Sequence, residues 1–340
     1  MKYGMKWVVI ALVLFGSAGP LRAQEVTVLG SQEETIALIE ADRWWAEKKR
    51  GQPLKVPYKM VVAITERWQK HAPKLPVATK KEIFFSSLLP LVVHANTMVL
   101  DRRSRIQEAN KKLARGKPLT SEEVATLKEM AVLLRIATRE KAAQMADSAE
   151  YKMVLKEALY RLDVIPAGLV LGQAAYESGY ATSRFAVEGN ALFGQWTFGG
   201  EGLVPEQQRK KIGDHRIASF DWPFDSVRGY YLNLSSHPAY KDFRRIRAEL
   251  KASGKPVGSL ALAAGLKSYS ERGQVYVDTL KGIIRANSLD IADSAVFRDE
   301  PMSFIVGAAD QAAAAKLRKD IEAMRKSGEL SMIIARMRLE

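Results

Sequence analysis

The chain has 340 residues, of which 47% are apolar and 26% charged, so its composition excludes a disordered protein and allows one large core or two smaller ones. It contains no cysteine, which excludes disulfide bonds and lipid attachment through a thiol. The formal net charge of +14 indicates either an anionic partner, such as a cell wall or a membrane surface, or simply a basic soluble surface.

The amino terminus predicts a secretory signal peptide over residues 1–23. Lys2 and Lys6 form a basic start, residues 7–15 form an apolar run too short to span a bilayer, and Leu21-Arg-Ala23 is a small-residue exit. An uncleaved N-terminal anchor is the alternative. Either way we expect the chain to leave the cytoplasm, and outside the cytoplasm nucleic acid fits poorly as a partner.

Residues 24–79 form an N-terminal extension whose prolines and mixed charges predict short helices and loops. From Lys80 to about Ala114 apolar residues recur at helical spacing, and Thr79 is placed to cap the start of this helix. Pro90 lies inside the run, so we expect a kink or a break between two helices there.

A second helix follows the turn at residues 116–118. Thr120-Ser-Glu-Glu123 has the spacing of a capping box, in which a hydroxyl and a carboxylate bind backbone amides at a helix start. Residues 80–150 are therefore expected to form a helical hairpin that acts as a scaffold.

The remaining chain predicts a mainly α fold with a small β element. Within residues 151–290 the pattern predicts one short strand, at 212–220, and a glycine-rich, mobile segment at 197–205. A C-terminal tail, residues 291–340, is expected to pack on the main domain as a strand at 302–307 and a helix broken at 326–328. Further helices are expected at 149–162, 225–234, 240–251, 257–269 and 275–287.

The stretch Leu169–Trp196 carries the chemistry. It begins as an apolar helix with a single acid, Glu177, which shares one helical face with Pro166, Val170 and Gln173. Gly179 is suited to end this helix in the left-handed conformation. Burial disfavours the charged form of a carboxyl group, and a carboxyl protonated near neutral pH can serve as a general acid in glycoside cleavage. A paired structural charge is the alternative role for Glu177.

The string Gln173-Ala-Ala-Tyr-Glu177-Ser-Gly-Tyr-Ala-Thr-Ser183, followed by Gly189-Asn-Ala-Leu-Phe-Gly-Gln-Trp196, resembles the glucosaminidase family (glycoside hydrolase family 73), and most closely its Bax-like branch. The likeness continues through Asp225-Ser-Val-Arg-Gly-Tyr230 and Tyr269-Ser-Glu-Arg-Gly273, and it covers residues 80–290. It implies a lysozyme-like α fold that cleaves the glycan of peptidoglycan after N-acetylglucosamine.

The resemblance also implies roles for residues. Glu177 would be the general acid, and Tyr269 would border the reacting sugar and hold its acetamido group or a water molecule. Tyr180-Ala181 departs from the Trp-Gly usual after the catalytic Ser-Gly, which affects the expected subsite shape. The residues expected to bind substrate are Asn190, Phe193, Gln195, Trp196 and Ser270.

The second catalytic group stays open. An inverting glycosidase needs a base about 6.5 to 9.5 Å from the acid, and a retaining one needs a nucleophile about 5 Å away. Alternatively the N-acetyl group of the substrate is the nucleophile. The candidate carboxylates are Glu201 first and Glu206 second, followed by Asp214 and Glu271.

No cofactor or metal is predicted. His215 and His237 lack paired ligand spacing, and Gly199-Gly-Glu-Gly202 lacks the spacing of a nucleotide-binding loop. The predicted function is an endo-β-N-acetylglucosaminidase acting on peptidoglycan in the periplasm or cell envelope. The alternatives are a lytic transglycosylase that uses the same glutamate and a non-catalytic protein that binds glycan or acts as a scaffold in the envelope.

Overall fold

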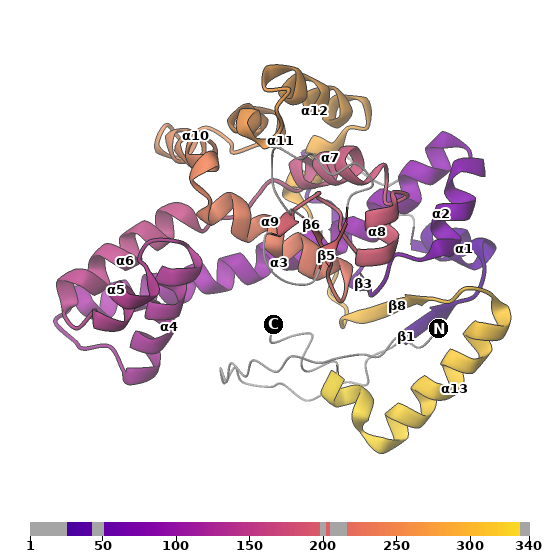
Figure 1. Ribbon diagram of the computed structural model, residues 1–340, viewed down its shortest axis with the longest axis horizontal. Helices are drawn as coiled ribbons and strands as arrows, with labels where there is room; N and C mark the ends of the chain where they lie inside the picture. The colour runs from indigo at the N-terminus through magenta and orange to yellow at the C-terminus, as the bar shows by residue number, and fades with distance from the viewer. Residues whose placement is uncertain (1–25, 43–50, 198–201, 205–215, 334–340) are drawn as a thin grey trace.

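The computed structural model describes residues 26–42, 51–197, 202–204 and 216–333, except for the side chain of Trp196. Within these residues the protein is mainly α-helical with short strands, which confirms the predicted lysozyme-like, mainly α class. Figure 1 shows a helical hairpin at one end of the molecule, a small sheet with its helices at the other, and α7 (Ala167–Ser178) between them.

The two ends of the chain share one parallel sheet. Strand β8 (Ser303–Gly307) lies between β1 (Val26–Leu29) and β3 (Lys59–Val61), so that Phe304 pairs with both Val26 and Met60. A second parallel pair joins β2 (Lys55–Val56) to β7 (Val296–Phe297). The helices of this region are α1 (Gln32–Asp42), α2 (Glu66–His71), the short 3₁₀ turn η1 (Ala72–Lys74) and α13 (Gln311–Ser327).

The prediction of helices and loops alone for the N-terminal extension was wrong. Three short strands lie there, and each pairs with a strand of the tail, which sequence patterns of the extension by itself do not reveal. The tail strand was predicted at 302–307 and is found at Ser303–Gly307. The predicted end of the tail helix is also confirmed, since Gly328 caps α13 in the left-handed conformation.

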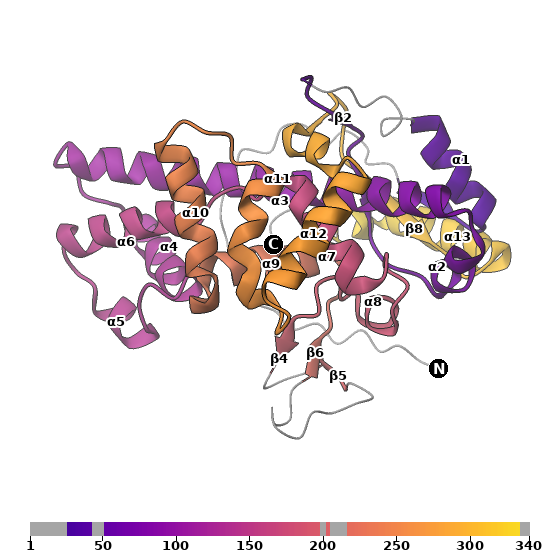
Figure 2. The same cartoon turned by 90° about the horizontal axis from the view of Figure 1, so that it is seen from above.

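The helix α3 (Val77–Ala114) runs along most of the length of the molecule (Figure 2). It carries the hairpin formed with α4 (Ser121–Leu133), α5 (Arg139–Gln144) and α6 (Ser148–Arg161). The predicted capping box at the start of α4 is present, with Thr120 Oγ1 accepting from the amide of Glu123 and the Glu123 carboxylate accepting from the amide of Thr120. By length and hydropathy α3 could cross a membrane, but 72% of its most apolar window is buried within the protein.

For α3 the predicted cap was wrong, and of the kink or break predicted at Pro90 the break does not occur. The helix begins at Val77 after Pro76, so Thr79 lies inside it and does not cap it. The helix also continues through Pro90, although proline lacks the amide that would bind the carbonyl of Ser86. Its neighbours Leu89 and Leu91 are buried in the core, and this burial maintains the helix where local propensity would end it.

The remaining elements surround α7. Three short antiparallel strands, in the order β4-β6-β5, lie to one side of α7 and α8 (Figure 2). They are β4 (Trp196–Thr197), β5 (Gly202–Leu203) and β6 (Arg216–Ala218), and β6 falls within the strand predicted at 212–220. The helices are α8 (Arg184–Gly189), α9 (Pro223–Ser236), α10 (Lys241–Ala252), α11 (Ser259–Leu262) and α12 (Gln274–Ala286), with 3₁₀ segments η3 (Pro238–Tyr240), η4 (Ala263–Tyr269) and η5 (Leu289–Ser294).

The start of α7 is fixed by a partly buried carboxylate and a close backbone contact. Asp293 accepts hydrogen bonds from the amides of Gly168, at 3.0 Å, and Ser259, at 2.7 Å. Burial raises the pKa of Asp293 in spite of these bonds. Gly168 lies against η5, where a methyl group would come within 2.2 Å of the carbonyl oxygen of Leu289. These contacts therefore hold the first turn of α7, the helix that carries Glu177, in place.

We expect Gly168→Ala to lower the free energy of unfolding by about 1–3 kcal/mol, because the methyl group meets backbone atoms that cannot turn aside. The matched control is Gly282→Ala in α12, where no atom lies within 4 Å of the new methyl group. That change should stabilise the protein by about 0.5–1 kcal/mol through helix propensity. Urea unfolding of both variants tests the difference in sign.

Candidate active site

Glu177 lies in the last turn of a helix that is otherwise almost entirely buried. It is the single charged residue of α7, and its side chain is partly buried. Its Oε1 accepts a hydrogen bond of 2.8 Å from the hydroxyl of Tyr276 in α12. Burial raises the pKa of Glu177, and the Tyr276 hydrogen bond opposes this by stabilising the carboxylate. Burial has the larger effect, so the group keeps its proton to a higher pH than an ordinary glutamate.

A left-handed turn ends α7 directly after Glu177. Gly179 has φ 58°, as predicted for the C-cap, and Tyr180 and Ala181 both have φ 61°. This conformation strains residues with a Cβ, so the glycine usual at the position of Ala181 in the resembled family would fit it more easily. Ser178 secures the turn, since its Oγ donates to the carbonyl of Ala174 and accepts from the amide of Ala181 at 2.8 Å.

The N-terminal extension supports this turn from outside. Trp68 Nε1 in α2 donates to the carbonyl of Tyr180 at 3.0 Å, and Gln69 Nε2 donates to the carbonyl of Thr182 at 3.0 Å. The ring of Tyr180 packs edge-on against Phe84 of α3. The position of Glu177 thus depends on segments far away in the sequence.

Two stacked tyrosines, Tyr269 and Tyr276, lie next to Glu177. The ring of Tyr269 stacks on that of Tyr276, with centroids 5.7 Å apart and planes at 7°. Its hydroxyl donates to the carbonyl of Phe193 at 2.9 Å. Burial raises the pKa of Tyr276 and of Tyr269, so both hydroxyls stay protonated donors at neutral pH. The structure therefore places Tyr269 beside Tyr276, the hydrogen-bond partner of Glu177.

The loop 190–195, which contains three of the residues expected to bind substrate, lies beside the second oxygen of Glu177. Gly194 has φ 59°, and a methyl group on it would lie 3.8 Å from Glu177 Oε2. Phe193 is buried and stacks on Tyr230 with a centroid distance of 4.3 Å. Asn190 Oδ1 accepts from the amide of Ile64 at 3.1 Å, while its Nδ2 donates to the carbonyls of Phe220 and Asp221. These side chains hold the loop in place.

The other residues predicted to bind substrate are Gln195, Trp196 and Ser270. The half-buried amide of Gln195 exchanges hydrogen bonds of 3.3 Å with Ser226. Trp196 pairs through its backbone with Ile217, and its side chain lies outside the described part. Ser270 Oγ accepts from the amide of Arg272 at 3.3 Å, and the guanidinium of exposed Arg272 donates to the hydroxyl of Tyr176.

The candidate second carboxylates divide into two groups. Glu201, Glu206 and Asp214 lie outside the described residues, whereas Glu271 is exposed in the turn after Tyr269. Among the described residues no carboxylate contributes to the pKa of Glu177, which depends on burial and on Tyr276. The identity of the second group stays a prediction.

The histidines show no metal geometry where they are described. His237 Nδ1 accepts from the amide of Ala239 at 3.2 Å and so caps η3, while His215 lies outside the described residues. Burial lowers the pKa of His237, with further lowering by Arg135 and Arg244. Within the described ranges no group of three or more His, Asp or Glu side chains is placed to hold a metal ion.

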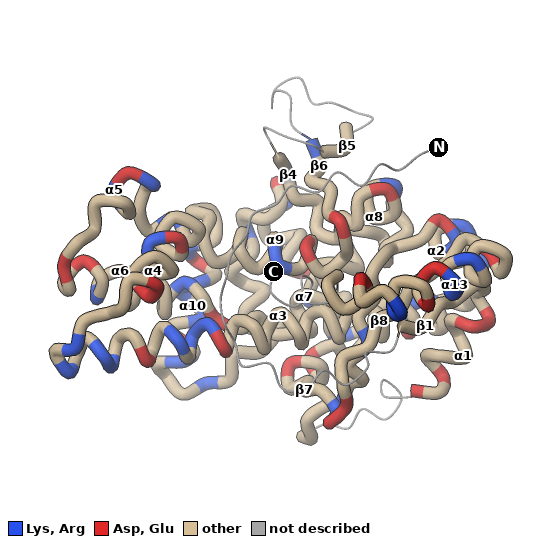
Figure 3. Tube along the Cα trace, turned by 90° about the horizontal axis from the view of Figure 1, so that it is seen from below, with Lys and Arg blue, Asp and Glu red and all other residues tan. Residues whose placement is uncertain are grey.

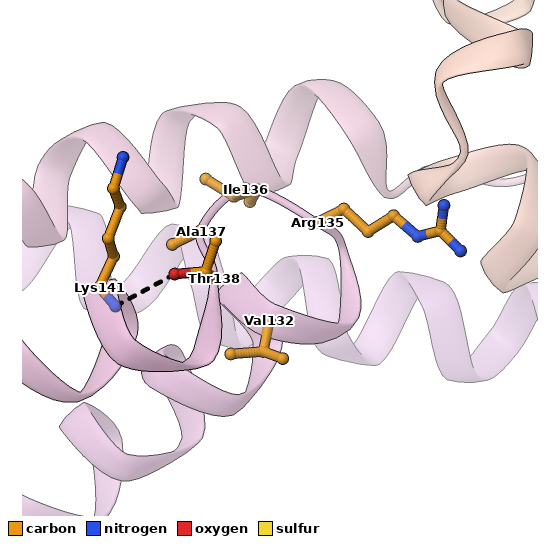
Figure 4. Close-up of a pocket in the computed structure, with 6 residues that line it drawn as sticks. All are labelled: Val132, Arg135, Ile136, Ala137, Thr138 and Lys141. Carbon is orange, nitrogen blue, oxygen red and sulfur yellow. Dashed lines mark hydrogen bonds between the residues drawn. The ribbon is translucent and has the colours of Figure 1, made fainter.

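A cavity of about 420 Å³ lies in the hairpin rather than at Glu177. In Figure 4 the side chain of Arg135 points away from the others, and Lys141 donates its backbone amide to Thr138 Oγ1. None of the predicted site residues lines this cavity. The candidate active site is therefore at Glu177, at the end of α7, and not in the hairpin. The lining of the cavity consists of Val132, Arg135, Ile136, Ala137, Thr138 and Lys141.

Comparison with known proteins identifies the family of the chain. Residues 152–289, which include α7, η4 and α12, match the sequence model of the Glucosaminidase family, described as mannosyl-glycoprotein endo-beta-N-acetylglucosaminidase. The chain is also 30% identical over 220 residues to Protein bax of Escherichia coli (strain K12), covering 64% of this chain and 74% of that protein. The chain belongs to the glucosaminidase family, in its Bax-like branch. No solved structure matches it significantly.

Membership in the glucosaminidase family supports a glycosidase with a glycan substrate such as peptidoglycan. Sequence reasoning singled out Glu177 but did not predict the hydrogen bonds that link it to other side chains. Tyr276 lies 99 residues from Glu177, and Tyr230 lies 57 residues from Gln173. The one local signal was the position of Gln173 on the same face of α7 as Glu177.

Proposed function

We propose that the protein is an exported peptidoglycan hydrolase that cleaves the glycan strand after N-acetylglucosamine, with Glu177 as general acid. One observation carries this proposal: Glu177 ends a buried apolar helix, and burial keeps its pKa raised against the opposing hydrogen bond from Tyr276. A glycosidase needs such a protonated carboxyl group to release a poor leaving group near neutral pH. Family membership places this residue in a domain that supports glycosidase activity.

In the proposed reaction the proton of Glu177 moves to the glycosidic oxygen as the bond from this oxygen to C1 of N-acetylglucosamine breaks. Positive charge develops at C1, and water supplies the hydroxyl group of the new reducing end. The carboxylate left on Glu177 is stabilised by the hydroxyl of Tyr276. The group that activates water or attacks C1 is one of Glu201, Glu206, Asp214 and Glu271, or the N-acetyl group of the substrate.

We further propose that Tyr269 and the loop 190–195 border the reacting sugar. Tyr269 stacks on Tyr276, and Gly194 faces Glu177 Oε2, so both lie next to the acid. Asn190 and Phe193 keep this loop in place. Gln195, Trp196 and Ser270 are the proposed glycan contacts. No cofactor enters this reaction scheme.

The proposal also includes export of the protein and its association with the anionic cell envelope. Residues 1–23 are proposed to direct export, and the net charge of +14 favours association with an anionic polymer. Lys and Arg recur along the helices α3 and α10 (Figure 3). Arg105 and Arg245 are exposed, whereas Arg244 and Arg247 are buried.

The test is digestion of purified sacculi followed by mass spectrometry of the released glycan ends. The proposal expects new reducing ends at N-acetylglucosamine. Anhydro-muramic ends would instead identify a lytic transglycosylase, which also needs one acid. Sedimentation of the protein with sacculi without any new sugar ends would identify a glycan-binding or scaffold protein.

A further inference from the structure

Three side chains from three helices form a line of hydrogen bonds that ends on Glu177. The hydroxyl of Tyr230 in α9 donates to Oε1 of Gln173 in α7. Nε2 of Gln173 donates to the hydroxyl oxygen of Tyr276 at 2.8 Å, and Tyr276 donates to Oε1 of Glu177 at 2.8 Å. Gln173 and Tyr230 are each 0% exposed, so water cannot replace any partner at this end of the line.

Tyr230 fixes the direction of the whole line. Among the described residues, Gln173 Oε1 is the acceptor for its buried proton. A glutamine amide has an acceptor on one side and donors on the other. If the Gln173 amide turned over, its NH₂ group would face the oxygen of Tyr230, and the proton of Tyr230 would lose its acceptor. Because a buried donor without an acceptor is disfavoured, the NH₂ group points to Tyr276.

The direction at Gln173 determines the protonated oxygen of Glu177. Tyr276 receives a hydrogen atom from Gln173, so its own proton is directed to Glu177 Oε1. In a neutral carboxyl group the carbonyl oxygen is the stronger acceptor, so the oxygen that accepts this hydrogen bond is preferentially the one without the proton. The proton of the neutral carboxyl group therefore lies on Oε2, the oxygen that faces Gly194 and the loop 190–195.

We propose that Gln173 and Tyr230 are positioning residues that hold the transferable proton of Glu177 on Oε2, toward the proposed sugar site. This inference rests on the proposed function for its catalytic meaning. Within the part of the chain that the structure describes, the titratable groups that interact with Glu177 are tyrosines: Tyr276 of α12, Tyr269 of η4, Tyr230 of α9 and Tyr240 of η3. They are neutral when the acid acts, so hydrogen-bond direction rather than charge places the proton.

Tyr230→Phe tests the proposal, because it removes the hydroxyl that fixes the Gln173 amide. A turned amide accepts the proton of Tyr276, and the oxygen of Tyr276 then accepts the Glu177 proton on Oε1, away from the loop. In sacculus digestion we expect kcat to fall about tenfold, with KM within about twofold of the native value. The alkaline limb of the pH profile should move to higher pH, because the Glu177 carboxylate loses part of its hydrogen bonding.

The matched control is Tyr231→Phe. Tyr231 is the next residue of α9 and is also buried, but its hydroxyl donates to Asn96 Oδ1 at 3.0 Å, outside the line. We expect its kcat and pH profile to stay native. Gln173→Met, which removes the amide at similar volume, should lower kcat by at least as much as Tyr230→Phe. The double variant should lose no more than Gln173→Met alone, and thermal unfolding confirms that each variant folds.

Carboxyl ¹³C NMR of the full chain measures the pKa of Glu177 without substrate, with Glu177→Gln assigning the signal. We expect the pKa to rise in Tyr230→Phe and to stay unchanged in Tyr231→Phe. If the native protein does not cleave sacculi but the NMR shift appears, the proposed function fails and the hydrogen-bond line stands. If the native protein cleaves sacculi and Tyr230→Phe matches Tyr231→Phe in rate and pKa, the positioning role is overturned.

Discussion

Glu177→Gln should reduce the cleavage of purified sacculi by about 10²–10⁴-fold, the contribution typical of a general acid. The amide has the shape of the carboxyl group and can still accept from Tyr276, but it has no acidic proton to give to the leaving oxygen. Reducing-end release under saturating substrate measures the effect. Cleavage at the native rate by a folded Glu177→Gln variant would remove Glu177 from the mechanism.

The same variant should be more stable than the native protein at neutral pH. Burial raises the pKa of Glu177 above its ordinary value of 4.5. A group with a raised pKa in the folded state stabilises the protein fully below pH 4.5 and loses this contribution as the pH rises through the folded pKa. At pH 7 the buried carboxylate therefore costs stability that glutamine does not.

Urea unfolding at pH 7 and pH 4 measures this cost. The advantage of Glu177→Gln should be present at pH 7 and shrink at pH 4, where glutamate is protonated in both states. Glu40→Gln is the control, because Glu40 is exposed on α1 and carries the same change of charge. An equal gain in both variants would show that the effect comes from net charge rather than from the site.

Tyr276→Phe is expected to lower kcat by roughly 10- to 100-fold, because a hydrogen bond to a charged group is worth about 1.5–3 kcal/mol. The hydroxyl of Tyr276 stabilises the carboxylate that forms as Glu177 gives up its proton. Removing it also leaves burial unopposed, so the pKa of Glu177 should rise and the alkaline limb should move to higher pH.

The measurement for Tyr276→Phe is the pH dependence of kcat, together with thermal unfolding to confirm the fold. Tyr231→Phe serves again as the control, since it removes a buried hydroxyl that does not reach Glu177. A loss of rate with an unchanged pH limb would assign Tyr276 to packing and not to the acid.

Local sequence was enough to predict the acid, its helix and the end of that helix. The apolar run, the single carboxylate and Gly179 all lie within a few residues of one another, and short-range patterns describe such features well. Resemblance to the family then gave the fold class. A kink or a break was predicted at Pro90 from local propensity. The break does not occur, because the buried neighbours of this proline keep the helix continuous.

Several features missed from the sequence depend on distant partners. Tyr276 and Glu177, which share a hydrogen bond, are 99 residues apart in the sequence. Gln173 and Tyr276, which share another, are 103 residues apart. The strands of the N-terminal extension pair with the tail near the other end of the chain. Neither relation leaves a periodic pattern in the segments concerned, so only the folded arrangement of helices and strands reveals them.

The central place of β8 has a consequence for the order of assembly. β1 and β3 are separated in the sheet by β8, so neither can form its native pairing until residues 303–307 are available. Contacts between such distant segments form slowly, because a long loop must close first. The extension that contains β3 also carries Trp68 and Gln69, which hold the turn behind Glu177. The sheet next to the segment that supports Glu177 therefore forms only after residues 303–307 have been synthesised.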